Sequence, residues 1–365
     1  MADKIRLGII GASPTVGWAH RSHLPAIAAS PEYELTGVCT TRMETAEVSK
    51  QQFGARLAFD DYQEMLAHPD IDAVAVVLRV PAHYQITKDA LNAGKHVFTE
   101  WPLGRTTGEA EELADLARAK GVKAVVGLQA RAAPAVLQMK QLVEQGYVGE
   151  IMACSMTLVR GGVLARPSGR TWQRDVELGA HTLTIATGHS VDAMRFVVGD
   201  FAEVSAIVST QCEQWYETDT DQYLDVTSPD NILINGRLTG GAVVSAHVAS
   251  IPWAGSGYRL EVYGREGTLI ADSEDSPQLG PVRLQGAQGS DELEELSISG
   301  QHHFVLEGMP QGAPYNVGQL YYMFGESIRG QGERQPDFDT AVDLHRLVDA
   351  IRLSSEQKQA VSVSE

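Results

Sequence analysis

The first 130 residues alternate between short apolar runs and segments with helical periodicity, and this alternation constrains the fold more than any other feature. The run 73–78 (AVAVVL) is apolar throughout, as expected for a parallel strand covered on both faces. Strand-like runs lie at 5–10, 33–39, 73–78, 96–99 and 123–127. A first helical segment ends near Ala29, and further helical segments span 44–53, 83–93 and 108–120. Strand–helix alternation of this kind predicts right-handed βαβ units and a doubly wound parallel sheet.

The pattern changes from about residue 134. Helices are expected at 134–145, 183–197 and 341–355, and strands at 151–159, 204–211, 231–238, 242–249, 259–263 and 268–271, with polar, Gly-rich loops and one or two edge strands over 273–303. Strands that follow one another without helices between them predict an α+β domain whose large, open, mostly antiparallel sheet has its helices on one face. We therefore expect a Rossmann domain over 1–130 and a substrate-binding and oligomerisation domain over 131–365.

Length, charge and cysteine content limit the number of domains and the classes of partner that this chain can have. A chain of 365 residues exceeds one ordinary hydrophobic core. The net charge of −18 disfavours nucleic acid as a partner. Neither a bilayer-spanning apolar run nor a signal-peptide pattern is present in the sequence, which favours a cytoplasmic protein without a membrane partner. Three widely spaced cysteines predict buried, reduced thiols rather than disulfides.

A glycine-containing loop, Gly11 to Gly17, follows the first strand and opens the first helix. In a Rossmann fold this position receives the pyrophosphate of a dinucleotide, because glycine permits the tight turn and the free amides of the helix start face the anion. The match to G-x-G-x-x-G is imperfect, since Ser13 replaces the middle glycine and the loop is one residue longer. Ser13 and Thr15 can compensate with hydroxyl donors; the alternative is an ordinary βα turn.

The end of the second strand helps to choose the cofactor. NAD sites usually carry a carboxylate there for the ribose 2′-hydroxyl, whereas an arginine can accept a 2′-phosphate. Here the strand is followed by Thr40, Thr41 and Arg42. NADP(H) is therefore favoured, and NAD(H) stays open because Glu44 lies close by and Arg42 can equally be a solvated residue at a helix start.

Several stretches in order resemble the Gfo/Idh/MocA family of NAD(P)-dependent oxidoreductases over nearly the whole chain. The segment 93–103 (AGKHVFTEWPL) is similar to the family's AGKHV..EKPL motif, and 79–83 (RVPAH) falls where the family has a loop and helix start ending in His. The stretches 172–175, 179–192 and 264–269 resemble later family segments. The resemblance implies a dinucleotide cofactor and a small-molecule sugar or polyol substrate, and it implies a homo-oligomer, dimer or tetramer, that associates through the open sheet.

Two positions depart from the family pattern. Trp101 replaces the lysine that points at the nicotinamide and the substrate hydroxyl, and Ile185 stands where an Asp would precede the histidine by four residues. Glu-Trp-Pro in place of Glu-Lys-Pro resembles the subgroup that includes the yeast galactose-regulon repressor, which binds dinucleotide but regulates rather than catalyses. Of the lysine, aspartate and histidine that the family uses in catalysis, only the histidine, His189, remains. We take His189 as the candidate general base; the alternative is that His189 is a core or helix-capping residue.

Each of the other candidate site residues also has a possible structural role. Trp101 and Trp172 can stack on nicotinamide or sugar or fill a core, and Glu100 can contact the nicotinamide ribose or act only on a helix dipole. Positive charge can come from Arg79, Arg131 or Arg160. The expected cofactor-binding set is Gly11, Ser13, Thr15, Val16, Thr41, Arg42, Arg79, His83, Glu100, Trp101, Arg131 and Trp172. We expect no metal site, because His181 and His189 do not share a helical face and Asp219, Asp221 and Asp225 are typical of a solvated loop.

Three functions fit these observations. The first is an NADP(H)- or NAD(H)-dependent oxidoreductase that acts on a sugar, cyclitol or related hydroxy compound. The second is a catalytically silent dinucleotide-binding regulator or sensor. The third is a redox-assisted lyase or glycosidase that holds its cofactor tightly.

Overall fold

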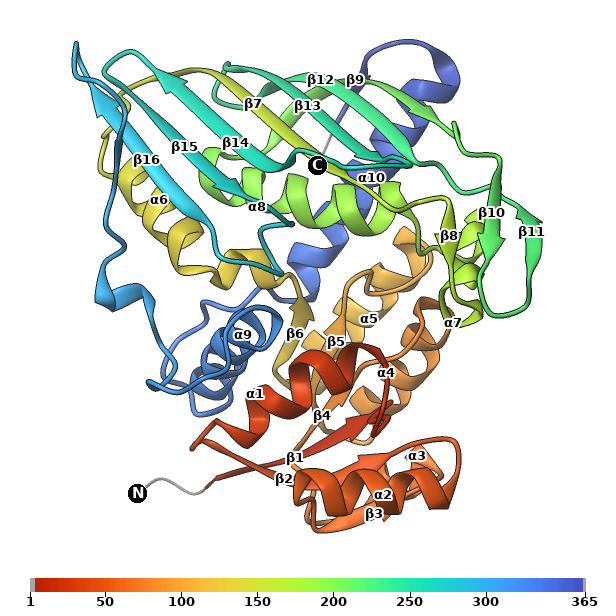
Figure 1. The fold of residues 1–365 in the computed structure, drawn as a ribbon. Helices are drawn as coiled ribbons and strands as arrows, with labels where there is room; N and C mark the ends of the chain where they lie inside the picture. Colours follow the sequence, from red (N-terminus) through yellow and green to blue (C-terminus); the bar gives the residue numbers. More distant parts are fainter. Residues whose placement is uncertain (1–3, 364–365) are drawn as a thin grey trace. The chain divides into compact units, whose positions relative to one another are not determined.

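The computed structural model describes residues 4–363, which divide into two compact units (Figure 1). The first unit contains the residues up to Gln129 together with His303–Asp343, and the second contains Ala130–His302 together with the residues from Leu344 onward. No helix within the described residues has the length and apolar composition required to span a bilayer.

The first unit is built on a six-stranded, wholly parallel sheet. Its strands are β1 Ile5–Ile10, β2 Tyr33–Cys39, β3 Leu57–Phe59, β4 Ala73–Val76, β5 His96–Glu100 and β6 Ala124–Gly127. Their order is β3-β2-β1-β4-β5-β6, so the direction of winding reverses between β1 and β4. This doubly wound order confirms the Rossmann prediction, and it places the carboxyl ends of β1 and β4 at the crevice where such sheets bind ligands.

Helices connect these parallel strands. They are α1 Leu24–Ala28, α2 Met43–Phe53, α3 Tyr62–Ala67, α4 His83–Asn92 and α5 Thr107–Lys120. All four residues of β4 are fully buried, as its unbroken apolar sequence predicts for a strand covered on both faces. The first helical stretch, residues 17–28, is continuous but contains a π-helical turn at Ala19–His23. Such turns are rare and concentrate at functional sites.

The second unit contains a nine-stranded sheet of order β17-β16-β15-β14-β7-β13-β12-β9-β18. The strands are β7 Ile151–Arg160, β9 Phe201–Ser209, β12 Asn231–Leu238, β13 Val243–Ser250, β14 Gly257–Gly264, β15 Gly267–Ser273, β16 Arg283–Gln288, β17 Glu294–Glu295 and β18 Val361–Ser362. Every neighbouring pair is antiparallel except β7 with β13. The predicted large, mostly antiparallel sheet is confirmed, including the two strands β16 and β17 within 273–303.

Helices cover one face of this sheet. Figure 1 shows α6 (Pro134–Glu144) and α8 (Gly188–Val198) lying along the same side. In β12, Ile232 and Ile234 are fully buried, whereas the intervening Leu233 is 39% exposed. Because successive side chains of a strand point to opposite faces, this alternation leaves the second face of the sheet solvent-exposed in the described chain.

A small three-stranded sheet adjoins the Gly/Arg-rich loop of the second unit. It consists of β8 Ala165–Arg166, β10 Gln214–Glu217 and β11 Gln222–Asp225, in the order β11-β10-β8. The short helix α7 (Ser168–Thr171) follows β8 and is anchored to the turn after β10, because Ser168 donates to the carboxylate of Asp219 from its amide and its hydroxyl. This substructure holds the loop in a defined conformation.

The helix α9 (Ala313–Ile328) is the main element that the sequence analysis does not predict. Ten of its sixteen residues are buried, including Tyr321 and Phe324, and the polar residues Asn316 and Gln319 are buried with them, so residue type alone does not mark the buried face. Tyr321 packs edge-on against Tyr33 of β2 and tilted against Phe98 of β5. These contacts place His303–Asp343 in the first unit, whereas the sequence-based division assigns it to the C-terminal domain.

Two other helices differ from expectation at their ends. The single helix expected at 183–197 begins as a π-helical turn, Thr182–Thr187, before α8 starts at Gly188. The final helix, α10, spans Phe338–Gln357 and so begins three residues earlier than expected. Of the three cysteines, all free, Cys39 and Cys154 are buried but Cys212 is half-buried, which corrects the expectation of three buried thiols.

Candidate functional site

The turn after β1 packs tightly against two neighbouring strand ends. Gly11 has a φ of +95°, and the amides of Gly11 and Ala12 donate to the carbonyl of Cys39 at 2.9 and 3.1 Å. A Cβ on Gly11 would lie 2.2 Å from the carbonyl oxygen of Val77, directly after β4. Glycine is therefore required here both by the backbone conformation and by the space available.

The last three residues of the loop, 15–17, are exposed to solvent, whereas Ala12 and Pro14 are buried. The Ser13 hydroxyl oxygen faces the amides of Thr15 and Val16 at 3.5 and 3.4 Å, so Ser13 braces the loop, and the Val16 side chain is 66% exposed. The helical stretch 17–28 starts at the end of this loop. Amides in the first turn of a helix have no intrahelical acceptor and carry partial positive charge. A close-packed glycine followed by exposed loop residues and a helix start fits the pyrophosphate of a dinucleotide.

The predicted ribose-binding residues lie at the end of β2. Thr41 and Arg42 are exposed, and Arg42 occupies the N-cap position of α2. The hydroxyl of Thr40 donates to the carbonyl of Arg42 at 2.8 Å and lies 2.5 Å from the hydroxyl of Thr45. These bonds brace the turn, so that the Arg42 side chain extends from a well-defined backbone.

His83, at the start of α4, links two loops of the first unit. Its Nδ1 lies 2.7 Å from the carbonyl oxygen of Pro102, and its Nε2 lies 3.0 Å from that of Leu78. Burial lowers the pKa of His83, whose side chain is 1% exposed. Its imidazole thus connects the loop after β4, which includes Arg79, to the Glu-Trp-Pro segment. These contacts are with protein backbone, and direct contact of His83 with a cofactor stays a prediction.

Glu100, the last residue of β5, is a buried carboxylate at the centre of a polar cluster. Its Oε1 accepts from His23 Nε2 at 2.7 Å, and both carboxylate oxygens lie within 3.0 Å of Gln129 Nε2. His23 Nδ1 in turn lies 2.8 Å from the hydroxyl of Tyr321 in α9. Burial by itself raises the pKa of Glu100, but the hydrogen bonds and charge interaction with His23 outweigh it, so that the pKa is lowered.

Neighbouring residues complete this end of the sheet. Gly127 closes β6 beside Glu100, and a Cβ there would lie 2.6 Å from the carboxylate. Trp101 follows Glu100, is 4% exposed and precedes Pro102 through a cis peptide bond. The first-unit candidates thus gather at carboxyl ends of parallel strands, as a Rossmann ligand site requires.

The remaining predicted residues belong to the second unit. Arg131 makes a bidentate ion pair with Asp192, with Nε and Nη2 at 2.8 and 2.6 Å from the two carboxylate oxygens. Asp192 lies one turn after His189 on α8, and His189 is 6% exposed. Arg131 therefore has a structural partner within its own unit. Trp172 is half-buried in a 3₁₀ turn, Trp172–Arg174.

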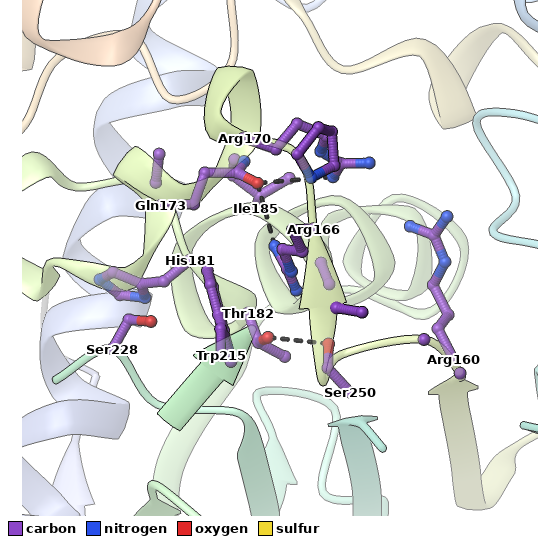
Figure 2. Close-up of a pocket in the computed structure, with 16 residues that line it drawn as sticks. Arg160, Arg166, Arg170, Gln173, His181, Thr182, Ile185, Trp215, Ser228 and Ser250 are labelled. Atoms are coloured by element: carbon purple, nitrogen blue, oxygen red, sulfur yellow. Dashed lines mark hydrogen bonds between the residues drawn. The ribbon is translucent and has the colours of Figure 1, made fainter. Parts of the chain in front are cut away.

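The second unit also contains a cavity of about 200 Å³ (Figure 2). It is lined by Ile185 and His181, whereas His189 is not among the described residues that line it. Burial lowers the pKa of His181 to about 4, so this imidazole is neutral at physiological pH. The other lining residues are Arg160, Gly161, Gly162, Ala165, Arg166, Pro167, Arg170, Gln173, Ala180, Thr182, Ala186, Trp215, Ser228 and Ser250.

Sequence reasoning missed most of this cavity. It considered Arg160 as a source of positive charge and His181 as a metal ligand, but did not single out Arg166 or Trp215. Trp215 is separated from Arg166 by 49 positions in sequence, and their contact depends on the pairing of β8 with β10. The one available signal was the unusual arginine content of residues 160–170. Within residues 4–363 no three His, Cys, Asp or Glu side chains are grouped so as to hold a metal ion.

Comparison with known families agrees with this architecture. Residues 5–128 match the model of an oxidoreductase family with an NAD-binding Rossmann fold, and residues 134–273 match the model of the Gal80p C-terminal domain. Dehydrogenase aclE of Aspergillus oryzae is 30% identical over 379 aligned residues, which cover 99% of each chain. The chain belongs to the Gfo/Idh/MocA oxidoreductase family. Its first unit is the NAD-binding Rossmann domain of that family.

Two further relatives show that the fold serves different roles in this family. Levoglucosan dehydrogenase of Pseudarthrobacter phenanthrenivorans is 24% identical over 99% of this chain and 98% of its own. A solved levoglucosan dehydrogenase complex with NADH matches with a TM-score of 0.86 at 23% identity, covering both chains fully. A structure of the Saccharomyces cerevisiae regulator Gal80p, a super-repressor mutant, matches with a TM-score of 0.88 at 22% identity, covering 99% of this chain and 98% of its own.

The close packing of Gly11 yields a stability prediction. Gly11→Ala places a side chain at positive φ, which costs about 1–3 kcal/mol, and also forces the loop away from Val77. Gly17→Ala is the matched control, because Gly17 has a φ of +94° but no atom lies within 4 Å of the position that its Cβ would take. Urea unfolding should show that Gly11→Ala lowers the free energy of unfolding more than Gly17→Ala by at least about 1 kcal/mol. Equal losses would refute the packing argument.

The Glu100 cluster yields a pH-dependent prediction. His23→Leu leaves a buried carboxylate without its main partner and should cost about 3–5 kcal/mol at pH 7. Because folding lowers the pKa of Glu100 from 4.5, the stabilisation is complete above that value and is lost as the pH falls below it. The difference from the unsubstituted protein should therefore shrink in acid. The double variant His23→Leu/Glu100→Gln, which lacks both titratable side chains, is the control: His23→Leu should be less stable than the double variant at pH 7, and this difference should shrink at pH 4 as the buried Glu100 takes up a proton, which chemical unfolding at both pH values tests.

Proposed function

We propose that this protein is an NADP(H)-dependent oxidoreductase that transfers a hydride between nicotinamide and a carbinol carbon of a sugar or related polyol. The observation that carries the proposal is the loop at the β1/β4 switch point, where a close-packed Gly11 and exposed residues lead into a helix start. Family membership supports the redox chemistry. The names of the relatives, which include levoglucosan dehydrogenase, support a sugar as substrate.

Residues of the first unit would hold the dinucleotide. Loop amides near Ser13, Thr15 and Val16 would donate to the pyrophosphate, and Thr41 with Arg42 would bind a 2′-phosphate on the adenosine ribose. The exposed Arg42 at the end of β2, preceded by Thr40 and Thr41 rather than by a carboxylate, supports NADP(H) over NAD(H). Glu100, Trp101 and His83 would form the nicotinamide end, with Trp101 offering an aromatic face.

Bound nicotinamide supplies a hydride acceptor at its ring carbon, and the protein must remove the hydroxyl proton of the substrate. We assign this role to His189, because imidazole titrates near neutral pH. Trp101 cannot supply the positive charge that a lysine would place near the developing alkoxide. Removal of one such electrostatic contributor typically costs about 10²–10³ in rate, so we expect slow but measurable turnover.

A second candidate function is a dinucleotide-binding regulator without turnover. The Trp101 substitution and the similarity of residues 134–273 to the Gal80p C-terminal domain favour it specifically. The two functions separate when purified protein is mixed with NADP⁺ and a panel of sugars and polyols. An increase in absorbance at the reduced nicotinamide band supports the oxidoreductase, whereas tight binding without any absorbance change supports the regulator.

The cofactor preference is testable at Arg42. Arg42→Ala removes the proposed 2′-phosphate ligand, and loss of a charge-assisted hydrogen bond of about 1.5–3 kcal/mol should raise the Kd for NADP⁺ about 10- to 100-fold. The Kd for NAD⁺ should change little. Lys50→Ala is the control, since Lys50 is a cation on the same helix that pairs with Glu47. Calorimetry that shows equal losses for NADP⁺ and NAD⁺, or none for NADP⁺, would contradict the assignment.

The catalytic assignment is testable at His189. His189→Ala should lower kcat by about 10²–10⁴ while the Kd for NADP⁺ stays nearly unchanged, because general-base catalysis contributes a factor of that size. His247→Ala is the matched control, because this half-buried histidine on β13 bonds Asn231 and does not line the cavity. If His181→Ala abolishes turnover and His189→Ala does not, then the cavity-lining histidine is the base and our assignment is wrong.

A further inference from the structure

The cavity of the second unit is lined by three arginines and by no acidic residue among those that the structure describes. Arg160, Arg166 and Arg170 all line it, and none of its sixteen described lining residues is an Asp or a Glu. This composition is unexpected in a chain with 47 acidic and 29 basic residues. Like charges held together destabilise a fold unless an opposite charge offsets them. The clustering therefore requires an explanation beyond stability.

Arg166 is the best-positioned of the three. It is the last residue of β8, and its guanidinium carbon lies 3.8 Å from the ring centroid of Trp215 in β10. Its Nη1 donates to Oε1 of Gln173 at 3.1 Å. Stacking and one hydrogen bond hold the planar guanidinium in a fixed orientation, which suits bidentate binding of an oxyanion.

The electrostatics of Arg166 indicate an uncompensated charge. Burial lowers the pKa of Arg166 to about 10, and the positive charges of Arg170 and Arg160 contribute in the same direction. The group still carries its proton at neutral pH. Glu217, which pairs with Arg166 in the register of β10 and β8, is engaged elsewhere, since its carboxylate accepts from the hydroxyls of Thr171 and Thr220.

Arg170 is directed to the same place from α7. Its Nη2 lies 3.4 Å from Oε1 of Gln173, the oxygen that also accepts from Arg166, and Figure 2 shows the two arginine side chains meeting at this amide. Arg160 stands apart in the same view and pairs with Asp275 at 3.2 Å, outside the cavity lining. Arg166 and Arg170 therefore form the cationic pair, with Arg160 as a more distant charge.

Several other lining residues carry neutral polar groups. Trp215 is 3% exposed, yet its indole N–H has no hydrogen-bond acceptor among the described residues. The hydroxyls of Thr182 and Ser250 lie 2.9 Å apart, and the imidazole of His181 is neutral. A buried N–H without an acceptor is costly, and a ligand oxygen would satisfy it. Hydroxyl and imidazole groups suit the hydroxyls of a sugar.

We propose that this cavity binds the anionic end of the substrate, with a carboxylate or phosphate of an anionic sugar bound by Arg166 and Arg170, and that the reacting carbinol lies outside the cavity lining, as the assignment of His189 as the base requires. The inference rests on the proposed oxidoreductase function and specifies its substrate class. The anionic group takes no part in bond breaking. In the oxidation, the carbinol C–H bond breaks as its electron pair leaves as hydride to NADP⁺, the hydroxyl proton passes to the base, and the product is a carbonyl compound with its anionic group intact.

Calorimetry on the protein saturated with NADP⁺ tests the proposal, with glucuronate, glucose 6-phosphate and glucose as probes. At least one anionic probe should bind at least about tenfold more tightly than glucose, because a charge-assisted hydrogen bond contributes about 1.5–3 kcal/mol. A preference for glucuronate identifies a carboxylate as the recognised group, and a preference for glucose 6-phosphate identifies a phosphate. Affinity for the anion should fall as NaCl is raised. Equal affinity for all three probes, or binding of glucose alone, overturns the proposal.

Variants locate the binding residues. Arg166→Met keeps an apolar side chain over Trp215 and should raise the Kd for the anionic probe about 10- to 100-fold. Arg170→Met, at an exposed position, repeats the test if Arg166→Met does not fold. Arg237→Met is the control, because this exposed arginine on β12 pairs with Glu203 and does not line the cavity. Unchanged anion affinity in both folded cavity variants contradicts the assignment.

Two readouts keep this inference separate from the proposed function. The Kd for NADP⁺, measured by calorimetry, should be the same in the cavity variants and in the unsubstituted protein. Anion binding that depends on Arg166 but leads to no reduction of NADP⁺ preserves the anion site and rejects the oxidoreductase. Reduction of NADP⁺ by glucose at the same KM in Arg166→Met and the unsubstituted protein has the opposite meaning, because it preserves the oxidoreductase and rejects the anionic substrate.

Discussion

A carboxylate that is 7% exposed must have partners, and Glu100 organises its half of the molecule through them. His23 and Gln129 bond the carboxylate, and His23 also reaches Tyr321 of α9. The helix that begins at the glycine loop, the end of β5 and the segment after β6 are thereby joined at one point. Because Glu100 immediately precedes Trp101, this cluster also fixes where the Glu-Trp-Pro segment leaves the sheet.

Buried charged side chains have two kinds of surroundings in this chain. Glu100 and Arg131 each have a complementary partner in their own unit, at hydrogen-bonding distance and with good geometry. Arg166 has a neutral amide oxygen, an aromatic face and two further arginines instead. The first arrangement stabilises a fold without a ligand. The second would be further stabilised by a bound anion, which is why we interpret it as a site rather than as packing.

The two departures from the family pattern have a common physical consequence. The sequence predicts that Trp101 and Ile185 stand where the family has a lysine and an aspartate, which would leave the reacting hydroxyl without the usual cation and the usual carboxylate. An aromatic ring and an aliphatic side chain contribute to ligand binding by burying apolar surface rather than through charge. Under the proposed function, the arginines of the cavity would carry a larger share of substrate recognition, and turnover would depend more heavily on His189.

Local periodicity determined the fold class from the sequence alone: the strand–helix alternation before residue 130 and the consecutive strands after it each reflect a pattern that neighbouring residues repeat. The Gly11 loop, the Arg42 turn and the Glu-Trp-Pro segment were also visible, since each is continuous in sequence. Only the tertiary structure showed that α9 belongs with the first unit, because that placement depends on the packing of Tyr321 against Tyr33 and Phe98, which lie far from it in sequence. The Glu100 cluster and the stacking of Arg166 on Trp215 likewise depended on tertiary packing and strand pairing, which bring together residues far apart along the chain and leave no trace in local sequence.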